Sequence, residues 1–190
     1  MTVFKGTPAN DTIVGTPGDD ILYGDRGDDH LDGGAGDDTV HGDQGRDVVR
    51  ASLGMDQTWL GAGNDTLDVY LAHLLEPDGR GSPNYHTVEL GIGTTLVHDF
   101  DPGHDKIEAY ISYQASPSGA VWGIPDVGRT LDTNHDGLIG AGDREVSDTK
   151  AGLVIDLGRL EDDYFGLSGH EGQDVALLGL HGVPDDVFTA

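Results

Sequence analysis

Cysteine is absent from this chain of 190 residues, and basic and aromatic residues are scarce. Without cysteine the chain has no disulfide framework, no thiolate zinc site and no cysteine nucleophile. Only 10 lysine and arginine residues oppose 35 aspartate and glutamate residues, which gives a formal net charge of −25. Because such a surface repels phosphate backbones, we expect no nucleic-acid partner.

Long apolar runs are also missing. No stretch approaches the roughly 20 consecutive apolar residues that cross a bilayer as a helix, so we expect no membrane insertion. The first residues, MTVFKGTPANDT, lack the apolar segment of an N-terminal secretory signal. Only 36% of the residues are hydrophobic, so a modest core must form against strong self-repulsion. The composition therefore predicts that a cation is needed to hold the fold.

A nine-residue period runs through the first third of the chain. From Gly6 the sequence divides into seven consecutive units that end at residue 68: GTPANDTIV, GTPGDDILY, GDRGDDHLD, GGAGDDTVH, GDQGRDVVR, ASLGMDQTW and LGAGNDTLD. Position four is glycine in six units, and position eight is aliphatic in six units, with Thr58 as the exception. Position six is aspartate in every unit: Asp11, Asp20, Asp29, Asp38, Asp47, Asp56 and Asp65.

Each repeated position has a physical role. Glycines at positions one and four permit tight turns, and the aliphatic residue at position eight is the inward residue of a short strand. Because nine is odd, successive units lie on opposite sides of a flattened coil, and alternate units stack about 4.8 Å apart. Stacked aspartates this close need a cation between them to stay ionised. Ca²⁺ is suited to this position because it accepts about six to eight oxygen ligands, backbone carbonyls included.

The units resemble the RTX, or hemolysin-type, calcium-binding nonapeptide repeat. The resemblance covers residues 6–68 and implies an all-β protein with a right-handed parallel β-roll that holds several Ca²⁺ ions between its turns. A Gly/Asp-rich linker is the alternative, but it gives no reason for an aliphatic residue every nine positions. The implied sites pair Asp11 with Asp29, Asp20 with Asp38, Asp29 with Asp47, Asp38 with Asp56, and Asp47 with Asp65. The remaining implied ligands are loop carbonyls, among them those of Gly15, Gly18, Gly24, Gly27, Gly33, Gly36 and Gly42.

The rest of the chain, residues 69–190, is expected to be a mainly β capping region for the roll of residues 1–68. An open roll exposes edge strands and core, which a cap must cover. Apolar runs at 151–158 and 174–180 predict strands. Strands at 95–100 and 106–111 flank a DPGHD turn that resembles the segment commonly found after RTX repeats. By that resemblance Asp99, Asp101 and Asp105 hold a further Ca²⁺, and an ordinary acidic hairpin turn is the alternative.

A second calcium signal lies in the capping region. Residues 132–143, DTNHDGLIGAGD, resemble an EF-hand-type loop of the dockerin-like form, with aspartate at position twelve. Gly137 provides the sharp turn and Ile139 is expected to pack inward. A solvated Asp/Gly loop is the alternative. The implied ligands are Asp132, Asn134, Asp136, the Leu138 carbonyl and Asp143.

The C-terminal residues resemble the uncleaved signal of type I secretion substrates, which is commonly an acidic pair before a short apolar tail. Here Asp185 and Asp186 precede residues 187–190. Together with the repeats, this resemblance implies the type I secretion machinery as a partner and a secreted, extracellular location.

No catalytic motif stands out. The sequence has neither H-E-x-x-H nor G-x-S-x-G, so we expect no enzyme. The sequence predicts a non-catalytic secreted calcium-binding module whose folding extracellular Ca²⁺ drives. Two alternatives stay open: an accessory module that binds a polysaccharide of the alginate type, and the C-terminal tail of a larger secreted protease or lipase.

Overall fold

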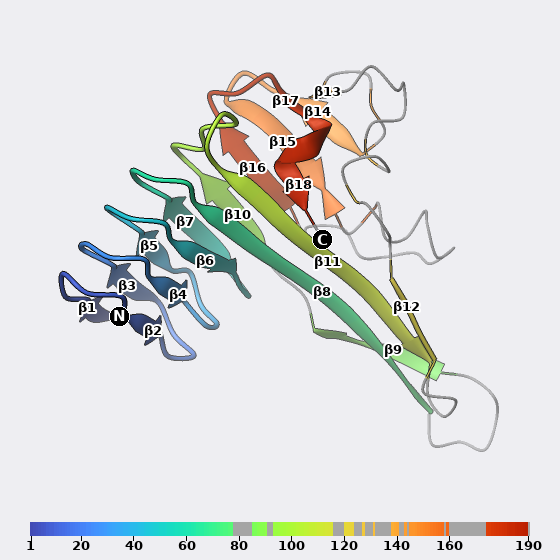
Figure 1. Ribbon diagram of the computed structural model, residues 1–190. Helices are drawn as coiled ribbons and strands as arrows, with labels where there is room; N and C mark the ends of the chain where they lie inside the picture. The colour runs from blue at the N-terminus through green and yellow to red at the C-terminus, as the bar shows by residue number, and fades with distance from the viewer. Residues whose placement is uncertain are drawn as a thin grey trace.

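A computed structural model describes residues 1–77, 85–90, 93–115, 120–123, 127, 131, 138–140, 143, 145–157, 159 and 174–189. The secondary-structure elements of this part of the chain are β-strands and one short 3-10 helix, η1 (Asp185–Val187) (Figure 1). None of the helical residues described belongs to a helix with the length and apolar character needed to cross a bilayer.

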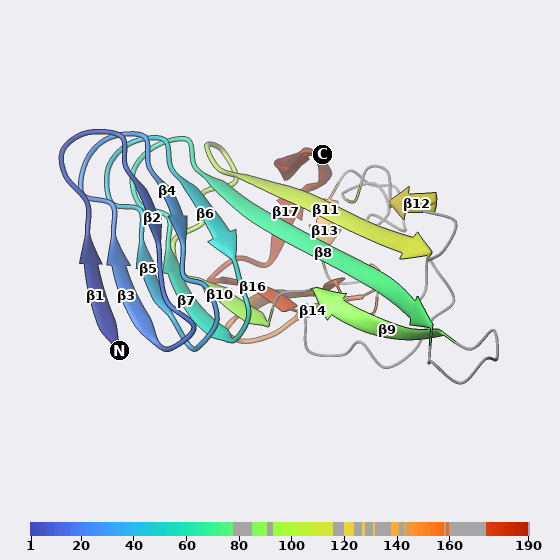
Figure 2. The same ribbon diagram turned by 90° about the horizontal axis from the view of Figure 1, so that it is seen from below.

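Two sheets face each other as the sides of a flattened coil (Figure 2). The first sheet runs in the order β1 (Thr2–Lys5), β3 (Asp20–Tyr23), β5 (Thr39–His41), β7 (Met55–Trp59), β10 (Thr94–Val97), β16 (Asp174–Leu178), β15 (Gly152–Asp156) and β14 (Val146–Asp148). The second runs in the order β12 (Ala120–Gly123), β11 (Lys106–Ala115), β8 (Thr66–Pro77), β6 (Val48–Ala51), β4 (His30–Asp32) and β2 (Thr12–Val14). β9 (Tyr85–Leu90) pairs with β8, and β18 (Phe188–Thr189) pairs with β11.

The predicted parallel β-roll is confirmed by the strand register. Leu31 in β4 pairs with Val49 in β6, and Val40 in β5 pairs with Thr58 in β7, each 18 residues further on. Successive units therefore alternate between the two sheets, as the odd repeat length predicted. The position-eight side chains from Leu22 to Leu67 point inward and are 0–2% exposed: Leu22, Leu31, Val40, Val49, Thr58 and Leu67.

Both sheets continue beyond the last nonapeptide. β8 extends past residue 68 to Pro77, β10 adds to β7, and β11 adds to β8, all in parallel. Since β10 and β11 belong to different sheets, the DPGHD segment between them is a turn of the roll and not a hairpin. The division into a roll at 1–68 and a cap at 69–190 stays a prediction.

The last part of the chain extends the first sheet: β16 adds to β10 in parallel, and β15 and β14 follow in antiparallel order. The strands predicted from the apolar runs are confirmed as β15 and β16, which pair antiparallel with each other. β13 (Leu138–Gly140) and β17 (Gly182–Pro184) form a separate antiparallel pair. Side chains from this region, such as Leu153, Ile155 and Leu177, are fully buried and join the hydrophobic cluster that begins inside the roll.

Candidate calcium-binding turns

The position-six aspartates form two ladders, one along each edge of the roll. One ladder contains Asp11, Asp29, Asp47 and Asp65, and the other contains Asp20, Asp38 and Asp56. In each ladder Oδ1 of an aspartate accepts a hydrogen bond from the backbone N–H of the aspartate 18 residues earlier. These N–O distances are 2.8 to 3.1 Å. The structure thus brings together all five predicted pairs, through a carboxylate–amide contact.

The second oxygen of four of these carboxylates has no partner. Oδ2 of Asp29, Asp38, Asp47 and Asp65 is buried without a hydrogen bond, and these residues are only 0–2% exposed. A buried acceptor without a donor is costly, and more so when it is charged.

Backbone carbonyls point at the same places. A Cβ added to Gly24 would lie 2.5 Å from Asp29 Oδ2 and 2.5 Å from the carbonyl oxygen of Gly42 in the next stacked turn. A Cβ added to Gly42 would lie 2.7 Å from Asp47 Oδ2 and would also meet the Leu60 carbonyl. Only glycine leaves room for this convergence of carboxylate and carbonyl oxygens.

The other predicted glycine ligands line the same two edges. At position one, Gly15 faces Oδ2 of Asp20 and the Gly33 carbonyl, and Gly33 faces Oδ2 of Asp38. At position four, the glycines of successive turns lie directly over one another, and those with positive φ include Gly27 (110°) and Gly36 (113°). The one predicted glycine with open space beside it is Gly18.

Burial makes the ionisation of these carboxylates unfavourable in the absence of a cation. Desolvation, reinforced by neighbouring aspartates, raises the pKa of Asp38 to about 6 and that of Asp47 to about 7. The same cause raises the pKa of Asp65 to about 6 and also raises that of Asp29. All the converging groups are oxygen acceptors and several are anionic, which is the donor set of Ca²⁺. Asp29, Asp38, Asp47 and Asp65 therefore fit the ion, which would supply the missing positive charge.

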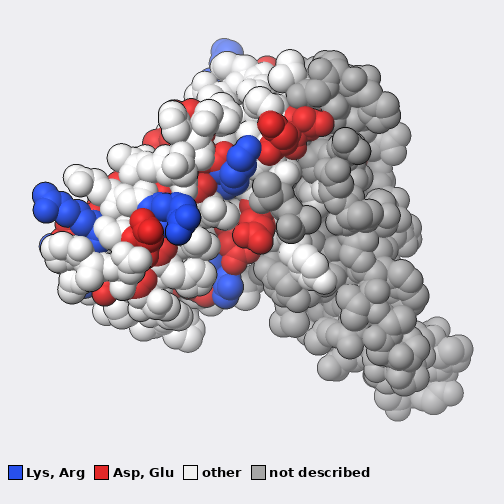
Figure 3. Space-filling view, in the orientation of Figure 1, with Lys and Arg blue, Asp and Glu red and all other residues white. Residues whose placement is uncertain are grey.

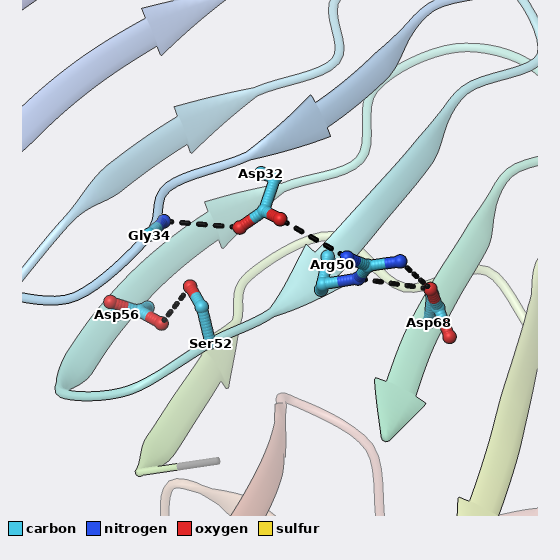
Figure 4. A network of polar contacts seen from close by, with 6 residues as sticks. All are labelled: Asp32, Gly34, Arg50, Ser52, Asp56 and Asp68. Atoms are coloured by element: carbon cyan, nitrogen blue, oxygen red, sulfur yellow. Dashed lines mark hydrogen bonds and ion pairs between the residues drawn. The ribbon is translucent and has the colours of Figure 1, made fainter. Parts of the chain in front are cut away.

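Acidic residues on the outside of the roll have protein partners instead. Arg50 lies between Asp32 and Asp68, with N–O distances of 3.2 Å to each (Figure 4). Arg46 pairs with Asp28 at 3.6 Å. On the face seen in Figure 3, the few basic side chains of the described residues lie among acidic ones. The ion pairs of the described arginines of the roll therefore lie at the surface. None of these arginines pairs with a buried carboxylate of the turns.

Three position-six aspartates differ from the others because a hydroxyl in their own turn satisfies Oδ2. Asp11 accepts from the Thr7 hydroxyl at 2.9 Å, and Asp20 accepts from the Thr16 hydroxyl at 2.7 Å. Asp56 accepts from the Ser52 hydroxyl at 3.2 Å (Figure 4). The Thr16 bonds lower the pKa of Asp20 to about 2. The sequence analysis did not make this distinction. Its signal was a hydroxyl residue at position two, which is threonine in units one and two and serine in unit six.

The acidic turn after β10 completes one ladder. Oδ1 of Asp105 accepts from the Asp65 N–H at 3.1 Å, and Oδ2 accepts from the Asp101 N–H at 2.8 Å. Asp99 accepts from the N–H groups of Leu60 and Gly61, at 2.8 and 3.1 Å. Asp105 is thus the next rung after Asp65. Backbone N–H groups donate to all three carboxylates, Asp99, Asp101 and Asp105. The Ca²⁺ site predicted for them stays a prediction.

The EF-hand-like loop lies mostly outside the described residues, which exclude Asp132, Asn134 and Asp136. Leu138 lies in β13, and Asp143 is 8% exposed and accepts from the Gly140 N–H at 3.0 Å. Ile139 is fully buried, in agreement with its expected inward packing. The ligand set of this loop stays a prediction.

Comparison with known proteins assigns the repeats. The family model of the RTX calcium-binding nonapeptide repeat (4 copies) matches residues 5–40 and 32–67. No curated protein matches the chain. A match among solved structures is the solution structure of the AlgE6R3 subunit from the Azotobacter vinelandii mannuronan C5-epimerase. It is 22% identical to this chain, covers 97% of this chain and 80% of that chain, and has a TM-score of 0.27. Residues 5–67 are therefore RTX calcium-binding nonapeptide repeats.

Proposed function

We propose that this protein is a non-catalytic module that is secreted and folds outside the cell when it binds Ca²⁺. The observation that supports this most directly is the set of buried, unpartnered carboxylate oxygens of Asp29, Asp38, Asp47 and Asp65. A site that exists only in the folded chain couples metal binding to folding. At low Ca²⁺ the repulsion between these carboxylates opposes the fold, and millimolar Ca²⁺ would reverse the balance.

The packing of the C-terminus fits transport before folding. Val187 is fully buried, Phe188 is 8% exposed, and β18 pairs with β11. Lys106 Nζ donates to the Asp186 carbonyl at 2.9 Å. A receptor that reads this segment as a type I secretion signal would find Val187 and Phe188 accessible only in the unfolded chain, which low Ca²⁺ in the cell would provide.

A calcium titration tests the module. We expect the far-UV circular dichroism of the chelator-treated protein to be largely that of a disordered chain, with β signal appearing cooperatively on addition of Ca²⁺. Asp38→Asn should weaken the response, whereas Asp37→Asn should not, because Asp37 is exposed and its Oδ1 needs only to accept the Met55 N–H. A protein that is equally folded in chelator and in Ca²⁺ would refute the proposal.

A polysaccharide-binding role is favoured by one separate observation. The outward residues of β1, β3, β5 and β7, and those of β10 with the adjoining His98, include no acidic side chain: Val3, Lys5, Ile21, Tyr23, Thr39, His41, Met55, Gln57, Trp59, Thr94, Leu96 and His98. Four of their rings stack in a column, with centroids 4.9 Å apart for Tyr23–His41, 4.7 Å for His41–Trp59 and 4.0 Å for Trp59–His98. An anionic polymer would meet less repulsion at this face than at the acidic faces of the chain.

Gel retardation in alginate, with and without Ca²⁺, separates the two roles. If the face binds the polymer, the Ca²⁺-loaded protein is retarded and the Trp59→Ala variant is retarded less. Equal mobility of the Ca²⁺-loaded protein with and without alginate would exclude this second role and leave the calcium module intact.

A further inference from the structure

Position two of the nonapeptide occurs in two conformations among the described turns. In the first, Thr7 and Thr16 each direct both the backbone N–H and the hydroxyl at Oδ2 of the aspartate four residues later. The N–O and O–O distances are 2.6 and 2.9 Å for Thr7 with Asp11, and 2.7 and 2.7 Å for Thr16 with Asp20. Ser52 directs its hydroxyl in the same way at Asp56. We call these the closed turns.

In the second conformation the position-two residue has a positive φ. The angles are 74° for Asp25, 97° for Gly34, 71° for Asp43 and 103° for Gly61. Each of these turns contains one of the four aspartates whose Oδ2 is buried without a partner: Asp29, Asp38, Asp47 and Asp65. We call these the open turns, and the match between positive φ and an unpartnered oxygen holds for all seven units.

The residue type explains the conformation. Glycine adopts a positive φ without steric cost, and aspartate does so more readily than most side chains. Threonine is β-branched and strongly disfavours that region, so its N–H and hydroxyl stay directed at the carboxylate. A single position outside the metal-binding aspartate therefore sets the state of each turn.

We infer that the position-two residue decides whether a turn accepts Ca²⁺, so that the four open turns take up the ion and the three closed turns replace it with their own donors. This inference rests on the proposed calcium module. A hydroxyl and an amide that both donate to Oδ2 stabilise the carboxylate, and they occupy the oxygen that a cation needs.

The closed turns lie at the ends of the two ladders, and the open turns lie between them. One ladder begins at closed Asp11, continues through open Asp29, Asp47 and Asp65, and ends at Asp105, whose Oδ2 accepts a backbone N–H. The other begins at closed Asp20, continues through open Asp38, and ends at closed Asp56. Each row of cation sites is thus bounded at both ends by a turn that the protein satisfies itself. The end turns of each row therefore need no ion.

Two pairs of variants test the inference by counting Ca²⁺ per chain with native mass spectrometry and equilibrium dialysis. Asp43→Thr should close the turn of Asp47 and remove about one ion. Asp43→Asn removes the same charge but tolerates the positive φ, and it should keep the wild-type number. In the opposite direction, Thr16→Gly should open the turn of Asp20 and add about one ion, whereas Thr16→Ser keeps the hydroxyl and should add none.

The gain in Thr16→Gly keeps the test decisive even if Asp43→Thr fails to fold. Equal ion counts for Thr16→Gly and Thr16→Ser, or for folded Asp43→Thr and Asp43→Asn, would overturn the inference while leaving the calcium module in place. A wild-type protein that binds no Ca²⁺ would instead overturn the proposed function.

Discussion

Replacing Asp47 by asparagine should stabilise the protein in chelator and destabilise it, relative to wild type, in Ca²⁺. The asparagine side chain keeps an oxygen that accepts the Asp29 N–H, now 2.9 Å from Asp47 Oδ1, and its amide can donate to the carbonyl of Leu60. Burial raises the pKa of Asp47 from 3.8 to about 7, so near neutral pH its ionisation opposes folding by at most about 4 kcal/mol. Solvent screening of an ion-free turn reduces this, and we expect about 2 kcal/mol.

This free energy corresponds to a roughly 30-fold larger folding equilibrium constant in chelator. Because we expect the ion-free chain to be mostly unfolded, the measurement is refolding by TMAO at pH 7.5 in chelator, followed by circular dichroism. The midpoint for Asp47→Asn should lie at a lower TMAO concentration than that of wild type. In Ca²⁺ the order of the thermal midpoints should reverse, because the variant loses a ligand and the linkage energy that goes with it.

The pH dependence gives an independent check of the sign. The folded-state pKa lies above the unfolded one, so wild type takes up a proton on folding, and its disadvantage in chelator should shrink as the pH falls from 7 towards 5. Asp19→Asn is the matched control, since Asp19 is exposed and its replacement should shift the TMAO midpoint much less. An Asp47→Asn variant that is less stable than wild type in chelator would refute the reasoning.

Three further outcomes are expected. Leu31→Ala, which empties a fully buried position in the roll, should lower the stability of the Ca²⁺-loaded protein by about 2–5 kcal/mol in urea denaturation, and a loss below 1 kcal/mol would contradict the core assignment. A fragment of residues 1–68 should stay unfolded by circular dichroism at millimolar Ca²⁺, because it lacks β10 and β11, and a fully folded fragment would show that these strands are dispensable. Mg²⁺ at equal concentration should induce little β signal in the whole protein, since it demands a small octahedral site and retains its waters.

The nine-residue period determined most of the roll. It predicted the 18-residue stacking, the inward side chains at position eight and the five aspartate pairs, because in a repeat fold each contact recurs between neighbouring units. The same local logic failed where the period breaks. Asp65 meets its partner 40 residues later, at Asp105, because β8, β9 and β10 intervene. No spacing in the sequence indicates that rung.

The sequence by itself therefore determined which residues face the core, which aspartates adjoin one another, and that a cation must lie among them, since all of this follows from periodicity and charge. Only the tertiary structure decided which carboxylate oxygens have a donor. That depends on the φ angle at position two and on the close approach of carbonyls from the next turn. The aspartate stands at position six of every unit, so the repeat makes all seven look alike. The stacked turns leave Asp29, Asp38, Asp47 and Asp65 without a donor and supply one to Asp11, Asp20 and Asp56.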